Sequence, residues 1–133
     1  MAPLADDVFF LSVAELSKKL KAKEISPVSL AEGYLERLER IGPKLGAVVT
    51  VTRDLALKEA RAAEAEIAAG KWRGPLHGVP YGVKDLLATK GIPTTWGAEP
   101  YRNQVFDEDA TVVKRLREAG AVPGSHAHTH TPA

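Results

Sequence analysis

The sequence predicts a layered α/β protein whose N-terminal half is helical. Before Gly70, apolar residues recur at the three- and four-residue spacing of amphipathic helices. From Gly74 onward the chain holds six of its nine Pro and seven of its eleven Gly, a density that favours loops and short strands. A helical segment near the C-terminal end is followed by a Gly turn and a strand-like pair at 121–122, and this order is typical of layered α/β folds.

Two helices are predicted in the first third of the chain. The first begins at Ser12, which has the capping-box spacing to Glu15. The second begins at Ser26, because Pro27 suits the first helical position, where no N–H is needed. The pair at 42–43, Gly-Pro, is expected to end the second helix. The predicted apolar faces are Val13, Leu16 and Leu20 on the first helix and Val28, Ala31, Leu35 and Leu38 on the second.

A short strand is predicted at 47–51, where β-branched residues gather. A third helix follows from about Arg53 to Ala69 and presents mainly methyl groups. This face suits close packing against a larger body, since alone it buries too little apolar area to hold a fold. Its members are Ala56, Ala60, Ala63 and Ile67.

A fourth helix is predicted with Asp109 as its N-cap and Gly120 directly after its last turn. Ala121 then begins a strand. The apolar positions of this helix are Val112, Leu116 and Ala119.

The composition excludes several classes of function. With 133 residues the chain fits one small domain or part of a larger one, and a net charge of +1 gives no field that draws it to nucleic acid or anionic lipid. Cys is absent, which excludes disulfides and Cys-ligated zinc. No apolar run reaches the roughly 18 residues of a membrane helix, and the acidic N-terminus does not match a signal peptide, so a cytoplasmic location is expected. No nucleotide-binding Gly pattern occurs, so no such cofactor is predicted.

Lys84 is the candidate catalytic residue. It is the only Lys or Arg between Arg73 and Lys90, in a run of apolar residues and Gly. Such surroundings suggest burial, and burial disfavours the charged ammonium. An amine that is neutral near pH 7 is a candidate general base. From spacing alone, an exposed pair with Asp85 at a strand end is the commoner arrangement, because most lysines are exposed.

Four segments together resemble the amidase signature family. They are GPLHGVPYGVKD at 74–85, KGIPTTWG at 90–97, DATVVKRLREAGAV at 109–122 and SPVSL at 26–30, and the resemblance covers about residues 10–122. It implies that this chain is the N-terminal part of an α/β/α sandwich around a large mixed sheet, with a helical N-terminal half and an incomplete sheet.

The resemblance also implies a hydrolase that cleaves amide C–N bonds of small-molecule substrates with a Ser nucleophile, a second Ser in a cis peptide and a Lys. Lys84 stands at the position of that Lys, which takes a proton from the nucleophile through the cis-Ser and helps return one to the leaving amine. A hydroxyl needs such a base to become a good nucleophile, and backbone N–H groups of a Gly-rich loop stabilise the oxyanion. The implied site holds no metal and no cofactor.

Both serines of that family belong to a signature downstream of the Lys, and this sequence ends before it. The only Ser after Lys84 is Ser125, whose neighbours Gly124 and His126 do not match the signature. We therefore expect a chain that has the base without the nucleophile and that is inactive alone.

The amidase portion is assigned to 1–122, because 123–133 diverges from the family pattern. Pro123 removes a backbone donor where a central strand would grow, which argues against continued sheet. A shifted reading frame, truncation and disorder are the alternatives for this tail. Its alternating His126, His128 and His130 lack a carboxylate or Cys to complete a ligand set, so no metal site is predicted.

Four residues near Lys84 stay outside the predicted site. His77 is expected to be a structural residue in a tight turn. Asp85 either orients Lys84 or pairs locally. Trp96 and Tyr101 are either packing anchors or walls of an entrance.

Three interpretations of function are open. The first is the amidase just described. The second is the A subunit of a tRNA-dependent amidotransferase, a glutaminase that acts with partner subunits, although the balanced charge predicts no direct nucleic-acid binding by this segment. The third is a truncated remnant or interaction fragment without catalytic activity.

Overall fold

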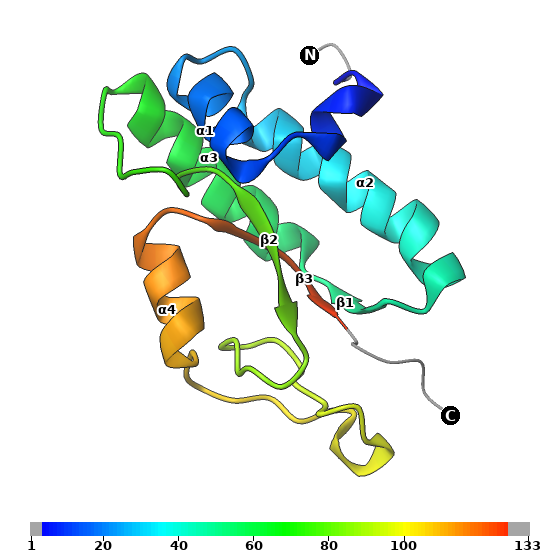
Figure 1. Cartoon of the computed structure of the whole chain (residues 1–133). Helices are drawn as coiled ribbons and strands as arrows, with labels where there is room; N and C mark the ends of the chain where they lie inside the picture. Colours follow the sequence, from blue (N-terminus) through cyan, green and yellow to red (C-terminus); the bar gives the residue numbers. More distant parts are fainter. Residues whose placement is uncertain (1–3, 128–133) are drawn as a thin grey trace.

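Two long helices cover a small sheet in the computed structural model, which describes residues 4–127 (Figure 1). Helices α2 (Pro27–Leu45) and α3 (Arg53–Ala68) pack against each other and against the central strand. Their contact is a core cluster of buried residues on both helices and the strand: Val28, Ala31, Leu35, Ala56, Ala60 and Val122. The face predicted for the third helix is confirmed, since all four of its members are buried.

The sheet has three strands in the order β1 (Val48–Val51), β3 (Val122–Ala127) and β2 (Pro80–Lys84). Strand β3 lies antiparallel to β1 and parallel to β2, so the sheet is mixed. Within residues 4–127, β1 and β2 each have one unpaired edge. The predicted α/β class, with a helical N-terminal half and an incomplete mixed sheet, is confirmed.

The first helix, α1 (Val13–Lys21), follows a short 3-10 helix, η1 (Asp6–Phe10). The predicted capping box is present: the Glu15 N–H donates to Ser12 Oγ at 3.1 Å, and the Ser12 N–H donates to Glu15 Oε2 at 2.7 Å. Leu16 and Leu20 are buried as expected, whereas Val13 is 48% exposed. A second core cluster joins α1 to α2 and to Val79.

Helix α2 begins where the sequence predicts and ends later. The Ser26 hydroxyl oxygen accepts hydrogen bonds from the N–H groups of Val28 and Ser29, at 3.1 and 3.2 Å. The predicted end at 42–43 is wrong, because the helix continues through Pro43 to Leu45. Pro43 falls in the final turn, where its missing donor removes a single bond, and Gly46 ends the helix with φ +61°.

Helix α4 (Thr111–Glu118) has Ala110 as its N-cap, so the prediction of Asp109 as N-cap is wrong. The Asp109 carboxylate instead accepts a hydrogen bond from the Lys90 N–H at 2.8 Å and forms an ion pair with Arg117. The apolar face also differs. Val113 is the fully buried residue of α4, whereas Val112 is 45% exposed.

The expectation that Pro123 ends the sheet is wrong. Strand β3 runs through it to Ala127 and forms the centre of the sheet. The register shifts where Tyr81 pairs with Pro123 and Gly82 with Ser125, which leaves Gly124 as the extra residue of a bulge. A bulge is one of the few sheet positions that accommodate a missing N–H. The Thr52 hydroxyl also donates to the Pro123 carbonyl oxygen at 2.9 Å.

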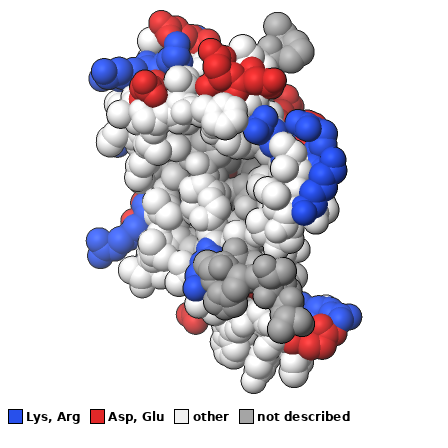
Figure 2. All heavy atoms as spheres, turned by 45° about the vertical axis from the view of Figure 1, so that its right-hand side comes forward, with Lys and Arg blue, Asp and Glu red and all other residues white. Residues whose placement is uncertain are grey.

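Charged side chains surround an uncharged region on one face of the molecule (Figure 2). The loop between β2 and α4 contains one short 3-10 helix, η2 (Glu99–Tyr101). Within residues 4–127, none of the helices combines the length and apolar character needed to cross a bilayer.

Candidate active site around Lys84

Lys84 is the last residue of β2, and its side chain is exposed. The strand alternates there: Gly82 and Lys84 are exposed, whereas Val83 is 3% exposed. The expectation that Lys84 is buried is therefore wrong for this chain. The physical reason is that β2 is an outer strand: Lys84 pairs with Ala127 of β3 on one side, and among the described residues no strand lies on the other side.

Within residues 4–127, the Lys84 amine has no hydrogen bond and no ion pair. Its backbone carbonyl accepts from the Leu87 N–H at 3.0 Å, which makes a turn directly after the strand. An exposed pair with Asp85 is not formed either. Asp85, the first residue after β2, is buried at 3% exposure, and its carboxylate binds Thr95 instead.

The Asp85 carboxylate binds the far end of the following loop. One oxygen accepts from the Thr95 N–H at 2.8 Å, and the other accepts from the Thr95 hydroxyl. The Asp85 N–H donates to the carbonyl of Ala127 at 3.0 Å, and the Trp96 N–H donates to the Asp85 carbonyl at 3.1 Å. Asp85 therefore joins strand β3 to both ends of the segment 85–96.

His126 extends this buried polar cluster. Its Nδ1 lies 3.5 Å from Asp85 Oδ1, and its Nε2 lies 2.9 Å from Thr89 Oγ1. The order carboxylate, imidazole, hydroxyl matches that of a hydrolytic triad. His126 and Thr89 are each only 1% exposed, however, so a substrate has no access to this hydroxyl. The cluster is structural in this chain.

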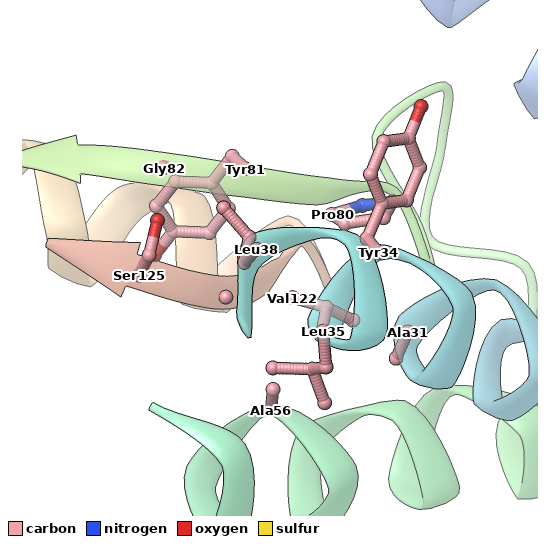
Figure 3. Close-up of a pocket in the computed structure, with 11 residues that line it drawn as sticks. Ala31, Tyr34, Leu35, Leu38, Ala56, Pro80, Tyr81, Gly82, Val122 and Ser125 are labelled. Atoms are coloured by element: carbon pink, nitrogen blue, oxygen red, sulfur yellow. The ribbon is translucent and has the colours of Figure 1, made fainter. Parts of the chain in front are cut away.

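An apolar cavity of about 250 Å³ lies between α2 and the sheet (Figure 3). Leu35 and Leu38 of α2 line one side, and Gly82 and Ser125 lie beside each other on the sheet side. A Cβ added to Gly82 would lie 3.4 Å from Ser125 Oγ. Ser125 is thus a strand residue at 4% exposure, packed against the residue two positions before Lys84.

His77 is fully buried, as a structural residue would be. The Arg73 N–H donates to its Nδ1 at 3.1 Å, and its ring lies 5.5 Å from the Trp72 ring. Trp96 and Tyr101 contact each other with tilted rings, whose centroids lie 4.8 Å apart, and they are 45% and 43% exposed. These two aromatic residues both anchor the loop and remain open to solvent.

No group of three potential metal-ligating side chains converges within the described part of the chain. Of the three alternating histidines, His126 is described, and His128 and His130 lie outside the described residues. The prediction of no metal site stays a prediction for that segment.

Sequence reasoning missed two features of this region. The Asp85–Thr95 contact had no local signal, because its two residues are ten positions apart and meet only when the loop folds back. The cavity had no signal either, because its walls come from helices and strands far apart in the sequence.

The fold and the site define a layered α/β protein with a solvent-facing lysine at the carboxyl end of a parallel strand, the edge where open α/β sheets bind ligands. A family model described as Amidase matches residues 29–133. The chain belongs to the amidase family.

Relatives of known identity agree with this assignment. The chain is 47% identical over 116 residues to the A subunit of a glutamyl-tRNA(Gln) amidotransferase from Carboxydothermus hydrogenoformans, covering 87% of this chain and 24% of the relative. It is 40% identical over 120 residues to an amidase from Pseudomonas putida, covering 90% and 25%. The chain thus spans about a quarter of the length of these relatives.

Among solved structures, the native peptide amidase from Stenotrophomonas maltophilia matches with a TM-score of 0.82 at 36% sequence identity. The match covers 87% of this chain and 24% of that one. The described fold is therefore one portion of a larger amidase fold.

Proposed function

We propose that this chain is the N-terminal portion of an amidase-type hydrolase that cleaves amide C–N bonds, with Lys84 as the proton-transfer base. The Lys84 amine at the carboxyl end of β2 carries the proposal, because among residues 4–127 it has no hydrogen bond and no ion pair. An ion pair would occupy the amine, whereas this amine is open to a partner from other polypeptide. Membership of the amidase family supports the reaction class.

In the proposed mechanism, a Ser hydroxyl attacks the amide carbon while its proton passes through a second Ser, in a cis peptide, to the Lys84 amine. The protonated Lys84 then returns a proton toward the departing amine, and water hydrolyses the acyl-enzyme. Both serines come from polypeptide outside the 133 residues. That polypeptide also needs to cover the exposed Lys84 side chain, because a base of this kind works only where water does not hold the amine charged.

Replacing Lys84 by Ala tests this role in a protein that joins this chain to the family's serine signature. We expect Lys84→Ala to lower kcat for amide hydrolysis by at least about 100-fold, the range of general-base catalysis, with the fold intact. Lys90→Ala is the matched control, since Lys90 is also exposed and lies six positions further along the chain. Turnover of Lys84→Ala close to that of the wild type would remove Lys84 from the mechanism.

A second candidate is the A subunit of a tRNA-dependent amidotransferase, favoured by the 47% identity to a relative of that name. Such a subunit would release ammonia from glutamine for use by partner subunits. Adding the partner subunits and measuring glutamine-dependent amidation of mischarged tRNA separates the two candidates. A stand-alone amidase would hydrolyse amides without the partners and would not respond to them.

A non-catalytic role is the third candidate. The purified 133-residue chain is expected to show no amide turnover, since Ser125, the only Ser after Lys84, is a residue of the central strand at 4% exposure. Turnover by this chain alone would contradict the proposal that the nucleophile lies elsewhere.

A further inference from the structure

We propose that Asp85 is a positioning residue for Lys84, and this inference rests on the proposed function of Lys84. Asp85 is the first residue after β2, and it acts by fixing the main chain directly beyond Lys84. It does not bind the Lys84 amine, touch substrate or transfer a proton.

Lys84 and Asp85 lie where β2 ends, and they differ in exposure. Lys84 is exposed, whereas the residues on either side, Val83 and Asp85, are each 3% exposed. A carboxylate buried to this degree is expensive unless hydrogen bonds satisfy it. The hydrogen-bond partners of the Asp85 carboxylate therefore indicate which segments its burial joins.

All of the side-chain partners of Asp85 lie on other segments of the chain. Thr95, ten residues ahead, provides two donors: its N–H at 2.8 Å and its hydroxyl. His126 of β3 lies 3.5 Å away. The Thr95 hydroxyl oxygen also accepts from the Gly97 N–H at 3.2 Å, so the contact reaches the residue beyond Trp96.

The backbone N–H and carbonyl groups of Asp85 also form hydrogen bonds. Its N–H donates to Ala127 on β3, and its carbonyl accepts from the Trp96 N–H. Trp96 has φ +54°, a left-handed conformation that is rare for a bulky residue and persists only where the surroundings enforce it. The hydrogen bonds between Asp85, Thr95 and Trp96 supply that enforcement.

These contacts hold the Cα atom of Lys84 between two fixed points. On one side, β2 is paired with β3. On the other side, Asp85, the first residue after Lys84, is held by five hydrogen bonds or close contacts to β3 and the loop end. A long, flexible side chain such as Lys reaches a defined position only when its attachment point is defined, and a misplacement of about 1 Å can cost about 100-fold in rate.

Three variants of the amidase that contains this chain test the inference. Asp85→Ala removes every side-chain acceptor, and we expect kcat to fall about 100-fold with KM little changed. Asp85→Asn keeps an oxygen for the Thr95 N–H and an amide N–H for the Thr95 hydroxyl oxygen, and we expect it to restore most of kcat. Asp107→Ala is the control, since that carboxylate is 97% exposed, and we expect wild-type kcat.

A second readout needs no catalysis. Reductive methylation with 13C-formaldehyde labels each lysine, and the Lys84 dimethylamine signal is assigned as the one missing from Lys84→Arg. We expect this signal to shift or broaden in Asp85→Ala and to match the wild type in Asp85→Asn and Asp107→Ala. A purely structural Asp85 would change the free energy of unfolding while leaving the Lys84 signal and kcat of the folded enzyme unchanged.

If Asp85→Ala does not fold, Thr95→Val removes the hydroxyl donor at nearly constant volume and is expected to change both readouts in the same direction by less. Unchanged kcat and an unchanged Lys84 signal in folded Asp85→Ala, or in Thr95→Val if that variant alone folds, overturn the inference. If Lys84→Ala itself keeps its turnover, the proposed function fails instead, and the methyl-lysine signal still decides whether Asp85 positions Lys84.

Discussion

His77 is enclosed by three segments of the chain and is 0% exposed. Its Nε2 lies 3.5 Å from Glu66 of α3, and a Cβ on Gly120 would lie 2.4 Å from its Cδ2. Burial lowers the pKa of His77 below its ordinary value, and the nearby Glu66 carboxylate opposes this in part. The Arg73 N–H donates a hydrogen bond to Nδ1 of His77, so this nitrogen acts as an acceptor.

This lowered pKa gives a stability that depends on pH. As the pH falls, the unfolded chain binds a proton at His77 before the folded chain does. The contribution of His77 to the free energy of unfolding is therefore fully present above about pH 6.5 and is lost as the pH drops through the folded-state pKa. Urea unfolding of the amidase that contains this chain, as wild type and as His77→Gln, measures the effect across this range. We expect the slope to be smaller in His77→Gln, and equal slopes in both proteins would show that another group is responsible.

Lys84 and Asp85 show how far residue-level prediction extends. The sequence offers two arrangements for Lys84, burial in apolar surroundings and exposure at a strand end, and the structure shows the exposed strand end without the pair to Asp85. The local sequence does not decide between them, because exposure depends on what packs around β2. The sequence also does not predict Thr95 as the partner of Asp85, since the Thr95 N–H and the Asp85 carboxylate come within 2.8 Å only when the loop has folded.

At the scale of secondary structure, α3 depends on the small size of its buried side chains. Ala56, Ala60 and Ala63 are between 0% and 3% exposed, and the first two share a core cluster with α2. Methyl groups leave little distance between packed helices, so this interface has no room for a longer side chain.

We expect Ala60→Leu to lower the free energy of unfolding by about 1–3 kcal/mol through overpacking. Ala65→Leu is the matched control, because Ala65 lies on the exposed side of the same helix and should change stability by less than about 0.5 kcal/mol. Chemical denaturation of both variants measures the difference. Equal changes in the free energy of unfolding would mean that helix propensity, and not packing, determines how substitutions in α3 affect stability.

The helix starts at Ser12 and Ser26 were predictable because a capping side chain acts within three residues of itself. The boundaries that failed depend on distant contacts. Asp109 has the chemistry of an N-cap, but its carboxylate binds Lys90 and Arg117 instead. The strand through Pro123 was missed because the bulge that accommodates it needs the register of β2.

At the scale of the whole molecule, both outer strands of the described sheet have free edges. Exposed apolar side chains include Phe10 at 78% and Leu45 at 70%, and one face lacks charge in its middle (Figure 2). Unpaired edges and open apolar surface favour association with other polypeptide.

The isolated 133-residue chain is therefore expected to unfold over a broad range at low temperature and to self-associate as its concentration rises. Differential scanning calorimetry and light scattering over a concentration series measure both properties. A sharp, reversible transition in a chain that stays monomeric would identify a self-sufficient module and favour the non-catalytic interpretation.

The central place of β3 also bears on how the polypeptide is made. Strands β1 and β2 are joined only through β3, which follows β2 by 38 positions, from Lys84 to Val122. At about 5–20 residues per second, a ribosome needs roughly 2–8 s to synthesise that interval. During this time the helical pair α2 and α3 can already dock, while two strands wait unpaired. The nascent sheet is thus most vulnerable to misassembly just before its middle strand emerges.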